Sequence, residues 1–252
     1  MRILLTNDDG ILADGLAALF EELRHDFEVS VVAPETEMSA VGHAITLANP
    51  LRINKFKRNG AFIGYGISGT PADCVKIAMQ EILELRPDMI LSGINLGSNV
   101  GINILYSGTA SAATEGAFFG IPSIAISLAT KTNPDFSFAA RFSRRLIKFV
   151  NTNGLRKGTA LNINIPAIEE KTIKGVSFTT QDLVSQRDIY EKRTDPRGNV
   201  YYWLAKEMPI EESLPHTDLR ALKEGWITIT PITFDLTDLK EAERLNSIGF
   251  DL

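Results

Sequence analysis

The chain has 252 residues, 44% of them hydrophobic, which is enough to bury the core of one large domain or of a domain with an appendage. Its 26 Lys and Arg residues against 31 Asp and Glu residues give a net charge of −5, which provides no overall attraction for a nucleic-acid polymer. The single Cys74 excludes an internal disulfide, and the sequence shows neither a long apolar run nor a signal sequence, so we expect a cytoplasmic protein without a membrane partner.

Apolar, strand-like segments alternate with amphipathic helical segments through residue 168. The strand-like segments lack strict alternation of polar and apolar residues, which indicates that both faces of the sheet are covered. This order predicts an α/β fold in which a mostly parallel sheet lies between helices. We expect strands at residues 2–6, 27–33, 88–92, 122–128 and 160–165, and helices at about 13–25, 71–85, 109–119 and 136–151.

The pattern changes after residue 168. Two strand-like pieces within residues 172–206 surround a turn at 195–199, which predicts a long β-hairpin arm. The aromatic run Tyr201-Tyr202-Trp203 favours one of two arrangements. Either the arm contacts a second copy of the chain, or it folds back onto its own domain.

The end of the chain is expected to return to the core. A strand at residues 226–230 and a short helix at 236–246 follow the arm. We therefore expect a catalytic core over residues 1–168, with an arm and C-terminal oligomerisation segment over 169–252 that packs with the core as a single domain.

Polar side chains follow three of the expected parallel strands, at the sheet edge where ligands bind in such folds. Asp8 and Asp9 follow the first strand, Ser39 the second and Asn95 the third. These are hard oxygen donors that suit Mg²⁺ or Mn²⁺, and a turn at Gly10 lets both carboxylates reach one ion. The alternative is a solvated turn in which an Asp caps the following helix.

An anion site is expected at Ser107-Gly108-Thr109. Free backbone N–H groups at the start of a helix bind anions, and the small residues here let a phosphate approach closely. No Lys follows the glycine, so this is not a Walker A loop. Ordinary helix capping by Thr109 is the alternative, although a cation site beside an anion site is what phosphoryl transfer needs.

A series of ordered motifs resembles the SurE family of stationary-phase survival proteins. The resemblance spans essentially the whole chain. It is carried by Asn7-Asp8-Asp9-Gly10, Ser39 with Ala44-Ile45-Thr46, Ser68 to Val75, Ser92-Gly93-Ile94-Asn95 with Gly97 and Asn99, Tyr106-Ser107-Gly108-Thr109, Asn162 to Pro166, Thr217-Asp218, Gly225 and Thr230-Pro231.

The resemblance implies a fold, an activity and a site. The fold is a Rossmann-like α/β core, and the activity is that of metal-dependent 5′(3′)-nucleotidases and acid phosphatases. One divalent ion per subunit, Mg²⁺ or Mn²⁺, would be held by Asp8, Asp9, Ser39 and Asn95. A homodimer or homotetramer would form by exchange of the arm and the C-terminal segment.

These features lead to a mechanistic hypothesis with Asp8 and Asp9 as the catalytic residues. A metal-bound water attacks the phosphorus of a nucleoside 5′-monophosphate directly, and Asp8 either only holds the ion or also takes the proton of that water. Asn95, Asn99 and residues 107–109 bind the phosphate oxygens. A covalent aspartyl-phosphate on Asp8 is the less favoured variant, because metal ligation reduces the nucleophilicity of a carboxylate.

One further residue and two other functions belong to the same hypothesis. His43 either assists proton transfer to the leaving group or forms a structural hydrogen bond. The runner-up function is a nucleotide- or sugar-phosphate-binding regulator without turnover. A metal-dependent glycosyltransferase would need an Asp-x-Asp after an internal strand and a separate acceptor domain, and the sequence shows neither.

Overall fold

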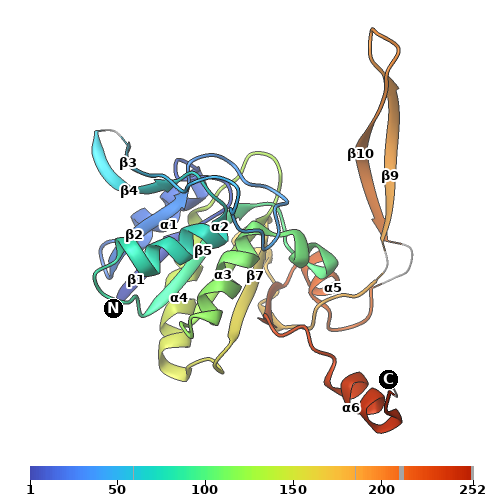
Figure 1. Cartoon of the computed structure of the whole chain (residues 1–252). Coiled ribbons are helices and arrows are strands. Elements are labelled where there is room, and N and C mark those ends of the chain that lie inside the picture. The colour runs from blue at the N-terminus through green and yellow to red at the C-terminus, as the bar shows by residue number, and fades with distance from the viewer. Residues whose placement is uncertain (59, 185, 210–212, 251–252) are drawn as a thin grey trace.

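The computed structural model describes residues 1–58, 60–184, 186–209 and 213–250. The described part leaves out residues 59, 185, 210–212 and 251–252. The first of these lies in the predicted core over 1–168, and the others lie in the predicted segment over 169–252. A nine-stranded sheet lies between helices and confirms the predicted fold class (Figure 1). Its strands, in spatial order, are β3 (Ile53–Arg58), β4 (Ala61–Ile67), β2 (Glu28–Pro34), β1 (Arg2–Thr6), β5 (Met89–Leu96), β6 (Ser123–Ala129), β7 (Thr159–Pro166), β11 (Ile227–Thr233) and β8 (Val176–Phe178).

Helices cover both faces of the sheet, as the apolar strands require. Within β1, Ile3 and Leu5 pack into the cluster that includes α1 and α4, whereas Leu4 packs into the cluster of α2 on the opposite face. The helices that flank the sheet are α1 (Asp14–Leu23), α2 (Pro71–Ile77), α3 (Gly108–Phe118) and α4 (Ser137–Asn153). None of the helices in the described part of the chain combines the length and the apolar character that a membrane span needs.

The strand order places a topological switch point near the centre of the sheet. β1 pairs in parallel with β2 on one side and with β5 on the other, so the chain reverses its direction of winding at β1. In open α/β sheets, ligands bind where neighbouring loops diverge at such a switch point. The turn after β1, which carries Asp8 and Asp9, therefore meets the end of β5, which carries Asn95, at the favoured position; Ser39 lies on the loop after β2.

Three elements of the core differ from the prediction. β3 and β4 form an antiparallel hairpin at one edge of the sheet that the sequence pattern did not predict. The predicted helix at 71–85 is α-helical only to Ile77 and continues as a π-helical segment, Ala78–Ile82. The short helix α5 (Asp218–Lys223) was also not predicted.

The arm is shorter than the predicted hairpin over 172–206. β8 joins the core sheet beside β11, so only β9 (Gln186–Thr194) and β10 (Val200–Pro209) form the arm. These two strands make a separate sheet that projects from the core, which excludes the alternative of an arm folded onto its own domain (Figure 1). The last helix, α6, runs over Leu239–Ile248 and also projects from the core, slightly later than predicted.

Candidate functional site

The acidic pair lies at the carboxyl end of β1, in a turn that the local sequence stabilises. Asn7 Nδ2 donates to the carbonyl oxygen of Gly10 at 2.9 Å, and Gly10 has a φ of +100°, a conformation that glycine adopts without strain. The backbone oxygen of Asp8 accepts from the Met38 amide at 2.7 Å, which joins this turn to the loop after β2. Asp8 is only 4% exposed.

The start of α3 contacts the first carboxylate directly. The Thr109 hydroxyl donates to Oδ1 of Asp8 at 2.6 Å. A Cβ atom at Gly108 would lie 2.7 Å from the Cβ of Asp8, so only glycine permits this approach. Ser107 caps the helix by accepting from the Ala110 amide at 3.0 Å. The structure thus brings Asp8 together with the three residues of the predicted anion site.

The second carboxylate reaches the loop after β5. The Leu96 amide donates to Oδ2 of Asp9 at 3.2 Å. Burial raises the pKa of Asp8, and burial together with the charge of Asp8 raises the pKa of Asp9 to about 6. Among the described residues neither carboxylate has an ion-pair partner, so no cationic side chain compensates the two adjacent acidic groups.

The two uncharged residues that the sequence predicts as metal ligands, Asn95 and Ser39, differ in burial and in hydrogen bonding. Asn95 is 9% exposed, and its Nδ2 donates to the Gly97 carbonyl at 2.7 Å, which leaves its side-chain oxygen available to a cation. Ser39 is exposed, and its hydroxyl donates to Oε1 of Glu37 at 2.6 Å. This bond uses the hydrogen of the hydroxyl, so the lone pairs of the Ser39 oxygen stay available to a metal ion.

Asn99 connects the site to the centre of the sheet. Its Nδ2 donates to Ser127 at 2.9 Å and lies 3.5 Å from the Thr109 hydroxyl, so it continues the row of polar groups that begins at Asp8. Asn162 and Asn164 of β7 donate to its backbone oxygen at 2.8 and 3.0 Å. These two asparagines were not predicted as site residues. Two amide side chains in a buried strand are a signal that they hold a neighbouring backbone segment.

His43 lies against the side of α3. Its Nε2 is 2.8 Å from Oε2 of Glu115, and its Nδ1 is 3.3 Å from the Thr114 hydroxyl. Lys76 donates to the other oxygen of Glu115 at 3.3 Å. Burial alone would raise the pKa of Glu115, but the bond with His43 and the positive charge of Lys76 together lower it. These contacts give His43 the geometry of an anchor for the loop after β2.

Comparison with known proteins identifies the relatives of this site. The family model described as "Survival protein SurE" matches residues 3–188. The chain belongs to the SurE family. Proteins named 5′-nucleotidase SurE from Syntrophus aciditrophicus and Syntrophobacter fumaroxidans are 51% and 49% identical to it; the alignments cover 98% and 97% of this chain and 94% and 98% of theirs.

A solved structure agrees with this assignment. The SurE protein from Aquifex aeolicus, known from a crystal structure, superimposes with a TM-score of 0.85 at 38% identity, and the match covers 98% of this chain and 99% of the other. The family predicted from the sequence motifs is therefore confirmed.

The donor set of this SurE-family chain fits a hard divalent cation. No group of three or more His, Cys, Asp or Glu side chains able to hold a metal occurs among the described residues, so a metal here relies on neutral oxygens besides Asp8 and Asp9. The buried Asp8 and the partly buried Asp9, with their raised pKa values, and the side-chain oxygen of Asn95 provide such a set. Oxygen donors of this kind match Mg²⁺ or Mn²⁺.

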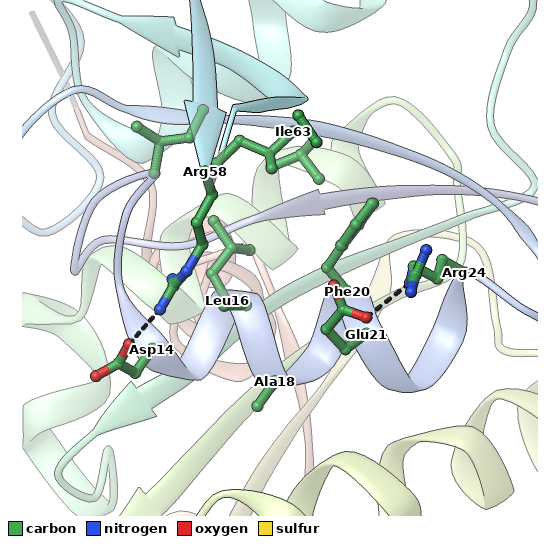
Figure 2. A pocket seen from close by; sticks show the side chains of 12 residues that line it. Asp14, Leu16, Ala18, Phe20, Glu21, Arg24, Arg58 and Ile63 are labelled. Atoms are coloured by element: carbon green, nitrogen blue, oxygen red, sulfur yellow. Dashed lines mark hydrogen bonds and ion pairs between the residues drawn. The ribbon is translucent and has the colours of Figure 1, made fainter.

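A separate cleft of about 510 Å³ lies between α1 and the β3–β4 hairpin. Figure 2 shows its apolar wall, with Phe20 and Ile63, and two ion pairs along α1 that join Arg58 to Asp14 and Arg24 to Glu21. Each cation in this wall already faces a carboxylate, whereas phosphate binding needs unneutralised donors. The charged groups of this cleft therefore do not form a candidate phosphate site.

Proposed function

We propose that this chain is a divalent-metal-dependent 5′-nucleotidase that hydrolyses nucleoside 5′-monophosphates to nucleoside and phosphate. The observation that carries the proposal is the 2.6 Å contact between Asp8 and Thr109, because it joins an acidic pair to the start of a helix. A cation site and an anion site in contact are the two parts that phosphomonoester hydrolysis needs. The names of the relatives in Syntrophus aciditrophicus and Syntrophobacter fumaroxidans support the activity.

The position of each residue determines its proposed role, either in binding the cation or in accepting a proton. Asp8, Asp9 and Asn95 would hold the cation, with the Ser39 oxygen as a further ligand while its hydroxyl donates to Glu37. When bound, the cation supplies electrophilic assistance at the phosphate and lowers the pKa of water. Asp8 faces the same space as the start of α3 and is the group placed to accept a proton from the attacking water.

The substrate phosphate is positioned by the start of α3 and its neighbour. The first amides of a helix have no acceptor within the helix, so those of Gly108 and Thr109 can donate to phosphate oxygens. Asn99 supplies a side-chain amide next to Thr109. These donors stabilise the negative charge that spreads over the oxygens during phosphoryl transfer.

The experiment is phosphate release from nucleoside 5′- and 3′-monophosphates, measured with Mg²⁺, Mn²⁺, Co²⁺ or Zn²⁺ and again with excess EDTA. Release that depends on the divalent ion is the expected result. Activity that persists in EDTA would contradict the metal requirement. Nucleotide binding without turnover under every condition would favour the regulator that the sequence left as runner-up.

We also infer that the arm and α6 bind a second copy of the chain. Tyr202 and Trp203 of the arm are 60% and 59% exposed, and Leu239 and Ile248 of α6 are 66% and 67% exposed. Apolar side chains gathered on projecting elements favour a protein partner, and a homodimer or homotetramer provides one.

A further inference from the structure

Two buried carboxylates lie outside the mechanism above. Asp182 precedes the arm and Asp218 begins α5; they are 2% and 0% exposed. Asp218 accepts from the backbone amides of Gly101 at 2.9 Å, Asp182 at 2.9 Å and Leu219 at 2.7 Å. A carboxylate this deeply buried costs free energy unless such bonds compensate for its lost hydration. Of these three bonds only the one to Leu219 lies within α5, so the bond to Gly101 calls for another explanation.

Gly101 is the end of the loop that carries Asn99. The Gly101 amide donates to Oδ2 of Asp218, and its carbonyl oxygen accepts from Nε2 of Gln181 at 2.9 Å. Gly101 has a φ of +59°, and a Cβ atom there would lie 3.2 Å from the backbone oxygen of Asp182. Both the backbone amide and the backbone carbonyl of Gly101 are therefore hydrogen-bonded to side chains from the part of the chain that follows the core.

The other side of the same loop is held by the sheet. The Asn99 amide donates to Oδ1 of Asn164 at 2.7 Å, and Asn162 and Asn164 donate to the Asn99 carbonyl. Because the backbone is fixed on both sides, the Asn99 side chain is aimed at Thr109 and Ser127. If the bonds to Gly101 were lost, only the contacts with β7 would orient the Asn99 side chain.

We propose that Asp218 is a positioning residue of the phosphate subsite, which holds the loop at Gly101 so that Asn99 faces the substrate phosphate. The proposal rests on the proposed function, because it takes Asn99 as a phosphate ligand. It gives the C-terminal part of the chain a role in substrate binding beyond the oligomerisation expected from the sequence.

The same contacts close the base of the arm. The Thr217 hydroxyl, after the arm, donates to Oδ2 of Asp182, before it, at 2.8 Å. An isolated bridge also joins Thr180 to Thr217. Figure 1 shows α5 between the core and the base of the arm. The two ends of the arm therefore meet at the group that holds the loop of Asn99.

The test is Asp218→Asn, which keeps the shape of the side chain but replaces one acceptor oxygen with an amide group. Loss of a bond to a charged acceptor corresponds to about a tenfold effect or more. We expect kcat/KM for a nucleoside 5′-monophosphate to fall by about that factor, and binding of inorganic phosphate in the presence of Mn²⁺ to weaken in parallel. The dissociation constant of Mn²⁺ alone, measured by calorimetry, should stay unchanged, because Asp8, Asp9 and Asn95 do not contact Asp218.

Two further variants complete the experiment. Glu224→Gln makes the same charge change at the exposed end of α5, where Glu224 pairs with Arg220, and should match the wild type. Gln181→Met removes the donor to the Gly101 carbonyl and should weaken phosphate binding in the same direction. If Asp218→Asn does not fold, phosphate binding by Gln181→Met tests whether the loop at Gly101 positions Asn99.

The proposal is overturned if folded Asp218→Asn binds phosphate and turns over substrate like the wild type, or if Mn²⁺ affinity falls as much as phosphate affinity. A wild-type protein that hydrolyses no phosphomonoester would contradict the proposed function instead. In that case the calorimetric comparison of phosphate binding still decides the role of Asp218.

Discussion

The Thr109 hydroxyl donates a 2.6 Å hydrogen bond to Oδ1 of Asp8, and this contact joins residues 101 positions apart in the sequence. Thr109 is fully buried at the start of α3, and Asp8 is nearly so at the end of β1. The bond fixes the orientation of the carboxylate that would hold the cation. It also brings the start of α3 to the place where a cation-bound phosphate would lie.

The first prediction concerns this bond. Thr109→Val keeps the branched shape of the side chain but removes the donor, so Asp8 loses its orienting partner. A hydrogen bond to a charged group contributes about 1.5–3 kcal/mol, which predicts a fall in kcat/KM of about 10- to 100-fold. The measurement is steady-state phosphate release at saturating Mn²⁺.

Ser111→Ala is the matched control for Thr109→Val. The Ser111 hydroxyl is also buried on α3, but it donates to the Gly108 carbonyl within the helix. Near wild-type activity is expected of it. An unchanged rate in Thr109→Val would show that the orientation of Asp8 does not depend on this bond.

The second prediction concerns the acidic pair. Asp9→Asn keeps the acceptor for the Leu96 amide but removes one of two adjacent charges. Since an amide oxygen is a poorer ligand for a hard cation than a carboxylate, Mn²⁺ affinity and turnover should fall together, each by about tenfold or more. Calorimetric titration with Mn²⁺ and phosphate release measure the two quantities independently.

Asp14→Asn is the control for this charge change. Asp14 lies on nearby α1, where it is exposed and pairs with Arg58, so Mn²⁺ affinity should be retained. An Asp9→Asn variant with full metal affinity and full activity would remove Asp9 from the metal site.

The parts of the fold that the sequence predicted are those with their own local signal. The run Ile3-Leu4-Leu5 is apolar on both faces, as a central parallel strand must be, and β1 has the predicted bounds. β3 gave no such signal, because Asn54, Lys55 and Lys57 are polar and exposed on an edge strand. Edge strands need little burial, so hydrophobicity does not reveal them.

In the site, too, some features could be predicted from the sequence and others could not. That Asp8, Asp9 and Asn95 lie at one edge of the sheet could be predicted, because each is close to the carboxyl end of a parallel strand and topology alone brings such positions together. The contacts that hold the surrounding loops could not be predicted. Glu115 reaches His43 across 72 positions, and Asp218 reaches Gly101 across 117, and no pattern within either segment encodes the pairing.

The third prediction concerns the pH dependence of the anchor at Glu115. Its pKa in the folded protein lies below the ordinary value of 4.5, so the ionised carboxylate stabilises the fold above that value. This contribution is lost as the pH falls through the folded-state pKa. Glu115→Gln should therefore lower Tm by a few degrees at neutral pH, and the difference from the wild type should shrink in acid below 4.5.

Thermal unfolding of both proteins across this pH range is the measurement, with Glu170→Gln as control. Glu170 pairs with Arg141 at the surface, where ion pairs contribute little to stability. A Tm difference for Glu115→Gln that stays constant down to strong acid would mean that the charge of Glu115 does not stabilise the anchor of His43.

The last prediction concerns the arm. Tyr202 and Trp203 are exposed on a two-stranded sheet that is separate from the core sheet, and burial of such rings against a partner is a large source of association energy. The double variant Tyr202→Ser with Trp203→Ser should therefore shift the sedimentation mass towards the monomer while Tm of the core changes little. Lys192→Ser is the matched control, because Lys192 lies opposite Tyr202 on β9 and presents no aromatic ring. If the double variant keeps the oligomeric mass of the wild type, the rings do not hold the copies together, and the exposed apolar residues of α6 become the remaining candidates.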